Sequence, residues 1–239
     1  WHERDISHSS VERVILPEKY QATVAYFPSN GQGSTAEKLA SRVAGAGGRL
    51  LSRELAEHEW AERFNIMRVK RLGPSLVPAE VVVPLMELPA VLAELDRRVR
   101  QPLALEGMGV SGKEAVLLGF IPHDQRTFGF NLAFALSLTV ANTAKRHGGR
   151  AYATGLYFAS EAPNVLGADR LAELAAFKAE VDPRGILNPG KVLSSRLAPF
   201  MRLASRFEPL LRPLANIARI RPGERIGRRP VKGIPAETA

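Results

Sequence analysis

The feature that most constrains the fold is a run of alternating apolar patterns between residues 76 and 146. It begins with a β-branched, apolar strand pattern and continues with a helix pattern, then two strand patterns joined at Ser111-Gly112, then a second helix. The residue ranges are Leu76–Leu85, Glu87–Val99, Leu103–Val110, Glu114–Ile121 and Phe130–Arg146. Strands joined by so short a turn pair as an antiparallel hairpin. The pattern therefore predicts an α+β fold, in which an antiparallel sheet is backed by helices.

Weaker patterns extend this region in both directions. Before it we expect strands at Gln21–Phe27 and Arg49–Ser52, with helices over residues 34–46 and Glu54–Leu72. After it we expect a strand-like stretch at Ala151–Ala159, a helix at Ala168–Val181 and a loop at Asp182–Lys191. The predicted organisation is a leader (1–20), a domain (21–195) and a basic, partly disordered linker or tail (196–239).

The positive charge is concentrated at the C-terminal end of the sequence. The chain has a net charge of +9, and residues 196–239 alone hold ten Arg or Lys against three Glu, a net +7. A globally basic nucleic-acid-binding domain is therefore not expected. The tail interleaves few aromatic side chains with its cations, so it also lacks the pattern of a single-strand binder, and we predict no nucleic-acid partner.

Composition excludes several kinds of chemistry. The chain has no cysteine, which rules out disulfides, zinc–thiolate sites and iron–sulfur clusters held by this chain. The most apolar stretch, 128–144, contains Asn and Thr residues and is too polar for a membrane span. Because no signal-peptide pattern stands at the front, we expect a cytoplasmic protein, with contact to a membrane surface through the basic tail as a further expectation. The chain begins at Trp1, as expected of a fragment.

Three segments resemble one family. They are WAERFNIMRVKRLGPSLVPAEVVVPL (Trp60–Leu85), HGGRAYATGLY (His147–Tyr157) and FKAEVDPRGILNPGKVL (Phe177–Leu193). Together, in this order, they are similar to the C-terminal cap domain of FAD-linked oxidases of the glycolate oxidase and D-lactate dehydrogenase type, within the vanillyl-alcohol-oxidase superfamily. The last segment is the most specific. The resemblance covers about residues 59–193 and implies a ferredoxin-like cap.

The resemblance implies individual site residues. Arg68 matches the family arginine that pairs with a substrate carboxylate, to which a guanidinium can bind through two hydrogen bonds, and a solvated basic face is the alternative. Glu80 stands where relatives often have an acid before the proline that ends the strand, which implies contact with the substrate, and a structural role is the alternative. Asn188 matches the asparagine of the signature that lies near flavin and substrate, and a short turn-forming role is the alternative. Lys191 would face a cofactor phosphate or the solvent.

The departures from the family matter equally. Many relatives have a catalytic histidine after the glycine pair, where this chain has Ala153-Thr154-Gly155. Many also have two metal-binding histidines in the hairpin, and Leu103–Phe120 has no histidine, so we predict no metal site. Tyr152 and His147 are the nearby groups able to transfer a proton in place of the missing base, with packing or capping roles as the alternative.

The family implies an FAD-dependent oxidoreductase that oxidises a small hydroxy acid or a similar polar substrate. It also implies an FAD-binding domain, which this sequence does not supply, so we expect that domain on a missing segment or separate chain and expect this chain to be inactive alone. Electrons would pass to a partner such as an iron–sulfur protein. The alternative is a non-catalytic interaction subunit that docks a partner or membrane through its basic tail.

The first residues carry a second resemblance. WHERDISHSSVERVILP, residues 1–17, is similar to the phosphate- and substrate-binding segment of bacterial adenylosuccinate lyases. In that family Arg4, Ser9 and Arg13 would hold the nucleotide. The lyase's catalytic histidines and helical bundle are not present, so we interpret the segment as a fusion or fragment junction and predict no lyase activity.

Overall fold

The structure, a computed structural model, describes residues 22–25, 33–64, 75–155, 157–191, 193 and 195–218. The chain divides into two units, Trp1–Arg68 and Val69–Ala239. Arg68, the leader resembling a lyase segment, and the end of the basic tail lie outside the described residues. The predicted boundaries at residues 20 and 195 stay predictions.

The first unit contributes two helices, α2 (Gly33–Gly45) and α3 (Arg53–Glu62). Ser52 caps α3, because its Oγ accepts a hydrogen bond from the Leu55 N–H at 3.2 Å. The predicted helix over 34–46 is confirmed, whereas the predicted helix from Glu54 ends at Glu62, with turns at residues 63 and 64. The strands predicted at 21–27 and 49–52 are wrong where described, since residues 22–25 and 49–52 are in neither helix nor strand. A strand needs a paired neighbour, and the sheet lies entirely in the other unit.

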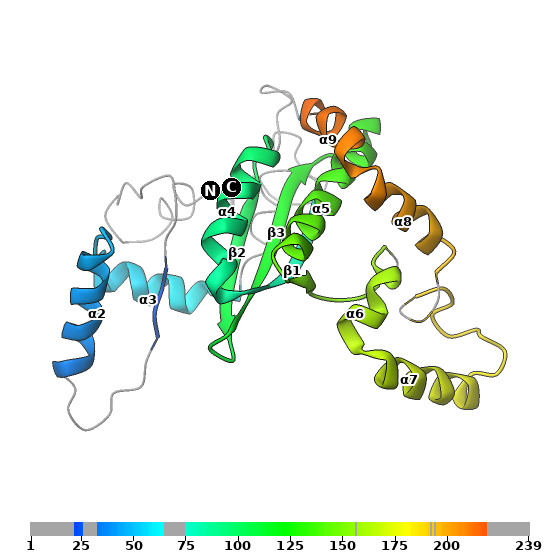
Figure 1. Ribbon diagram of the computed structural model, residues 1–239, viewed down its shortest axis with the longest axis horizontal. Coiled ribbons are helices and arrows are strands. Elements are labelled where there is room, and N and C mark those ends of the chain that lie inside the picture. The colour runs from blue at the N-terminus through cyan, green and yellow to red at the C-terminus, as the bar shows by residue number, and fades with distance from the viewer. Residues whose placement is uncertain are drawn as a thin grey trace, which may run out of the picture. The chain divides into compact units, whose positions relative to one another are not determined.

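The second unit contains the predicted α+β core (Figure 1). Its strands are β1 (Ser75–Pro84), β2 (Ala104–Val110), β3 (Glu114–His123) and β4 (Arg150–Ala151). They form an antiparallel sheet in the order β2-β3-β1-β4. With α4 (Leu88–Arg98) after β1 and α5 (Phe128–Arg146) after β3, the order is βαββαβ, the ferredoxin-like arrangement.

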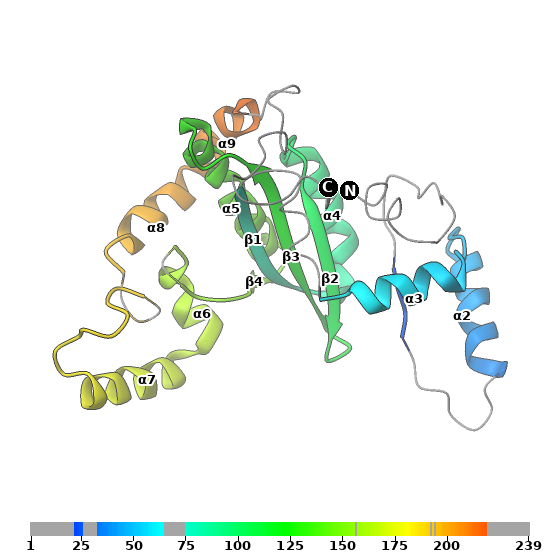
Figure 2. The same cartoon turned by 180° about the vertical axis from the view of Figure 1, so that it is seen from behind.

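Helices α4 and α5 cover one face of the sheet (Figure 1). Alternate residues of β1 point into this layer, and Val77, Ala79, Val81 and Val83 are at most 1% exposed. They pack with Leu95 of α4 and with apolar side chains of α5 in one core. The other face of the strands is seen in Figure 2, where they lie in front of α4 and α5.

The fourth strand is much shorter than the sequence predicts. The pattern at Ala151–Ala159 predicts a strand, but β4 ends at Ala151 and Ala159 begins the short helix η3 (Ala159–Glu161). Tyr152 still donates its N–H to the Glu80 carbonyl at 3.1 Å. Backbone groups alternate between the two neighbours of a strand, so Pro78 is the next β1 residue toward β4. Proline has no N–H to donate, and the pairing stops there.

The chain then returns to the core through several helices. After η2 (Leu85–Glu87), which precedes α4, the remaining helices are α6 (Ala162–Leu166), α7 (Ala168–Val181), α8 (Ala198–Arg206) and α9 (Glu208–Ile217). Both α8 and α9 pack against α5. Ala215 is fully buried, and buried Glu208 accepts a 2.6 Å hydrogen bond from Thr139 of α5. Residues 198–217 are thus part of this unit's packing, although the charge pattern placed them in a tail. Among the described residues, no helix is long and apolar enough to cross a membrane.

Candidate functional site

The sheet register brings Glu80 and Tyr152 together on the face that α4 and α5 do not cover. Val81 of β1 is paired with Ala151 of β4, and both are 1% exposed in the core. Because side chains alternate along a strand, the neighbouring pair, Glu80 and Tyr152, points to the opposite face. Directly opposed residues of antiparallel strands have Cβ atoms about 4.5–5.5 Å apart. Two residues that the sequence singled out separately are therefore neighbours.

The same row continues across the sheet to a third polar residue. Glu80 is paired with Leu118 of β3, and Leu118 is paired with Glu106 of β2. The row Glu106–Leu118–Glu80–Tyr152, which we call the sheet row, lies on the face opposite to the buried residues of β1 and β3, because side chains alternate along a strand. Sequence analysis overlooked Glu106. The hairpin pattern contained the signal, because a turn at Ser111-Gly112 sets Glu106 opposite Leu118.

Burial sets the electrostatic character of Glu80. It raises the pKa of this carboxyl above its ordinary value, because the charged form is disfavoured away from water. No described residue forms a hydrogen bond or ion pair with the Glu80 side chain. Tyr152, which directly follows β4, is 46% exposed and presents a phenol beside Glu80. The pair thus offers a carboxyl group and a phenol to a polar ligand.

The signature loop, residues 182–191, owes its sequence to its backbone. Gly185, Asn188 and Gly190 have φ angles of 62°, 44° and 71°. Only glycine enters this left-handed region freely, and asparagine tolerates it better than most residues. Asp182 fixes the loop, since its carboxylate accepts hydrogen bonds of 2.9 Å from the N–H groups of Ile186 and Leu187. The turn-forming alternative for Asn188 is thus part of its role.

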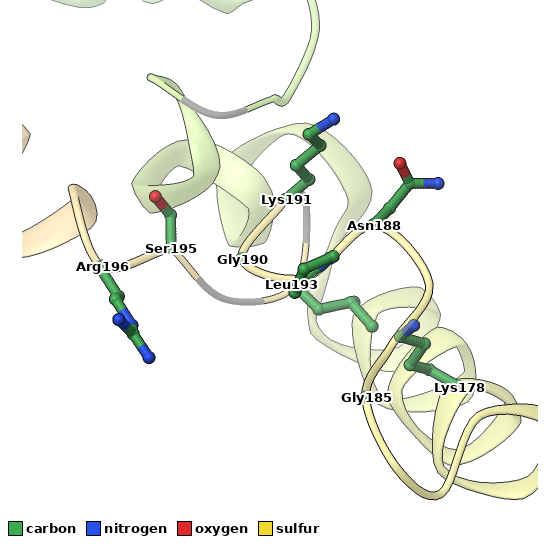
Figure 3. A pocket seen from close by; sticks show the side chains of 9 residues that line it. Lys178, Gly185, Asn188, Gly190, Lys191, Leu193, Ser195 and Arg196 are labelled. Carbon is green, nitrogen blue, oxygen red and sulfur yellow. The ribbon is translucent and has the colours of Figure 1, made fainter.

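A shallow hollow of about 470 Å³ lies along this loop (Figure 3). Its lining includes Lys178, Asn188, Lys191 and Arg196, and none of the described residues that line it is acidic. Lys178 forms an ion pair with Asp182. Its hydrogen bond is the main reason why the pKa of the Asp182 carboxyl lies below its ordinary value. Lys191 and Arg196 pair with no acid in the described part of the chain. Sequence analysis did not single out Lys178 or Arg196.

The side chains of the loop point in different directions. In the view of Figure 3, Asn188 and Lys191 point to the same side of the loop, and Arg196 points to the other. The Asn188 amide makes no hydrogen bond within the described residues. One face of the loop therefore presents a free amide beside a cation, which is a donor set for an anionic group such as a phosphate.

His147 lies elsewhere, in the helix layer. Its Nδ1 is 2.9 Å from Glu87 Oε2, and its Nε2 is 2.9 Å from Glu94 Oε2. Glu94 also pairs with Arg98 of its own helix and with Arg146 of α5. The structure thus separates His147 from Tyr152 and places it in an ion cluster that joins the end of α5 to α4. Its predicted role in proton transfer remains a prediction.

The His147 cluster makes the stability of this unit depend on pH. Hydrogen bonds to Glu87 and then Glu94 raise the pKa of His147 above its ordinary value, because they favour the imidazolium. The folded chain binds this proton more tightly than the unfolded chain. The stabilisation is therefore complete below the unfolded pKa of about 6.5 and is lost as pH rises through the folded pKa.

We expect His147→Gln to lower the free energy of unfolding most below pH ~6.5 and progressively less at higher pH. Urea unfolding of both proteins across this range measures the difference. Glu87→Gln serves as a check, since it should bring the pKa of His147, followed by NMR, back toward its ordinary value. A difference in stability that does not change with pH would contradict the ionic role.

Two further sequence predictions concern this site. Arg68 lies outside the described residues, so its predicted contact with a substrate carboxylate stays a prediction. The described residues contain no group of three or more His, Cys, Asp or Glu that could hold a metal ion.

Comparisons with known proteins place the chain in a family. A model of the family described as FAD linked oxidases, C-terminal domain, matches residues 18–192. No curated protein matches the chain. Among solved structures, the cytoplasmic N-terminal domain of subunit I, a homolog of subunit a, of V-ATPase is similar at 19% identity, over 82% of this chain and 57% of that chain. Its TM-score of 0.25 is too low to support an argument about fold or function. Because the family model matches most of the length of this chain, the chain belongs to the family of C-terminal domains of FAD-linked oxidases.

Proposed function

We propose that the chain is the substrate-facing cap of an FAD-dependent oxidoreductase that oxidises a small hydroxy acid or a similar polar substrate. Its FAD-binding domain would lie on another segment or a separate chain. The observation that supports this most is the sheet row, which sets Glu80 beside Tyr152 on the face without helices. Since the chain has no cysteine, an iron–sulfur group that receives the electrons belongs to a partner.

The signature loop fits the anionic part of FAD. Its hollow is lined by Lys191, Arg196 and Asn188 and, among the described residues, by no acid, which suits the phosphates of a dinucleotide. We assign Asn188 and Lys191 to the cofactor, because both point to the same side of the loop (Figure 3). When bound, FAD supplies the hydride acceptor for the oxidation.

The remaining predicted residues act on the substrate in this proposal. Arg68 pairs with its carboxylate, and Glu80 contacts a polar group of the substrate from the sheet. The Tyr152 phenol relays the hydroxyl proton as the substrate is oxidised, accepting it while its own proton passes to solvent. The sheet face excludes water and holds the substrate in a fixed orientation, which lowers the barrier by positioning.

The first test is the visible absorption spectrum of the purified chain after incubation with excess FAD and removal of unbound cofactor. We expect a folded, colourless protein, since the hollow is shallow and offers a cationic loop without an enclosing cavity. A retained flavin band would contradict the proposed division of labour between cap and FAD-binding domain.

In the assembled enzyme, two Asn188 variants distinguish the turn-forming role of this residue from its proposed contact with FAD. Asn188→Gly keeps the left-handed turn and removes the amide, whereas Asn188→Ala removes the amide and strains the backbone by about 1–2 kcal/mol. We expect both to release FAD roughly three- to tenfold more readily, as measured by flavin fluorescence on dilution. Retention by Asn188→Gly equal to that of the parent would leave Asn188 as a turn residue alone.

A further inference from the structure

Helices α8 and α9 leave a line of large apolar side chains uncovered. Both helices pack against α5 and have a buried face, which includes Met201 in α8 and Ala215 in α9. On another face, six large apolar side chains are each between 46% and 77% exposed. We call this line the apolar seam, and its members are Phe200, Leu203, Phe207, Leu210, Leu214 and Ile217. Figure 1 shows the two helices in succession beside α5.

The spacing of the seam keeps its members on one side of each helix. Phe200 and Leu203 of α8 are three residues apart, Leu210, Leu214 and Ile217 of α9 are four and three apart, and Phe207 lies at the junction. Isolated exposed apolar side chains are ordinary, but six of them on two successive short helices mark an interaction surface.

The solvent-facing charge that residues 196–218 themselves contribute is positive. Residues 196–218 contain four arginines and a single acid, Glu208. Glu208 is 1% exposed and bonds to Thr139 and Arg212, so its charge is turned inward. Arg202 and Arg206 form no ion pair in the described part of the chain. The sequence that follows, residues 219–239, adds six Arg or Lys and only two Glu.

We propose that the apolar seam docks this chain onto an anionic lipid surface. Large apolar side chains on one face of a helix, with arginines beside them, suit insertion about 5–10 Å into the boundary between headgroups and acyl chains. The arginines then reach the phosphates, and long basic side chains do this readily. The helices would lie in the plane of the membrane.

Other occupants fit the seam less well. A partner helix packed along a 3-4 repeat needs one continuous helix. Here the helices break at Phe207, whose φ and ψ are −92° and 9°, and Pro209 and Pro213 follow. A second copy of the chain would bring arginines against arginines. A lipid surface requires neither a straight helix axis nor a complementary charge pattern from another protein.

The test is flotation of the full chain with phosphatidylcholine vesicles, with and without phosphatidylglycerol. We expect binding to the anionic vesicles alone, weakening as salt rises. Leu203→Gln with Leu210→Gln, one change on each helix, should weaken binding on the order of tenfold or more. Phe177→Gln with Val181→Gln, two exposed apolar residues of α7, is the matched control and should bind like the parent.

A second pair of substitutions tests the charge. Arg202→Glu with Arg206→Glu should abolish the preference for anionic vesicles, and circular dichroism verifies that each variant is folded. The proposal fails if the seam variant binds like the parent, or if neutral and anionic vesicles bind equally. It also fails if the parent does not float and instead forms a dimer that the seam variant loses, which would assign the seam to a second copy.

Discussion

Gly149→Ala is expected to lower the free energy of unfolding by about 3 kcal/mol, the upper part of the range for overpacked sites. Gly149 lies directly before β4, where the chain passes between the end of α5 and β1. A Cβ added there would collide with the Val82 carbonyl oxygen, and would lie 3.0 Å from the Ala144 oxygen and 3.2 Å from the Val83 Cα. All three are backbone atoms, so no side chain can rotate away to make room.

Gly109→Ala is the matched control, because a Cβ at Gly109 of β2 meets no atom within 4 Å. Glycine weakens a strand by about 0.5–1 kcal/mol relative to alanine, so this variant should be as stable as the parent or slightly more stable. Urea unfolding followed by circular dichroism measures both. Equal stability of the two variants would show that β4 does not approach β1 as closely as described.

The parts of the fold that sequence predicted well are those that local pattern determines. The strand at 76–85, the hairpin around Ser111-Gly112 and the helix at 130–146 each carry their own period and turn residues. The two strands of the hairpin can pair in few ways, because a short turn fixes their register. The α+β class, the antiparallel sheet and the family are accordingly confirmed.

The errors arise where a distant residue decides the local structure. The pattern after Ala151 is strand-like, yet β4 stops because the partner strand presents Pro78. In residues 197–217 the sequence predicts interrupted amphipathic turns, and α8 and α9 form there, but it does not say what they pack against. The burial of Ala215 and Glu208 depends on α5, a distant helix, as the end of β4 depends on Pro78.

The candidate site shows the same division. The signature loop could be found from its sequence, because its Pro and Gly residues predict a loop, and the structure adds that Gly185, Asn188 and Gly190 are left-handed. The neighbourhood of Glu80 and Tyr152 could not, because it depends on the register between β1 and β4, which are far apart in the sequence. That register turns two separate predictions into one testable pair.

In the assembled enzyme, Tyr152→Phe is expected to lower kcat by about a hundredfold or more and leave KM nearly unchanged, if the phenol relays the substrate's proton. The substitution removes only the hydroxyl. Glu80→Gln should do the reverse, because a residue that only binds substrate affects KM more than kcat. Steady-state rates with the hydroxy-acid substrate measure both.

Tyr157→Phe is the control, because it removes the same hydroxyl group from a tyrosine outside the proposed site. Tyr157 is as exposed as Tyr152, at 45% against 46%, but its ring packs on Phe134 with ring centroids 4.7 Å apart. Loss of its hydroxyl should leave kcat unchanged. A Tyr152→Phe enzyme as fast as the parent would remove this phenol from proton transfer. His147, whose ring nitrogens both face carboxylates, would then be the remaining predicted candidate, and it lies in the helix layer where a substrate on the sheet row does not reach it.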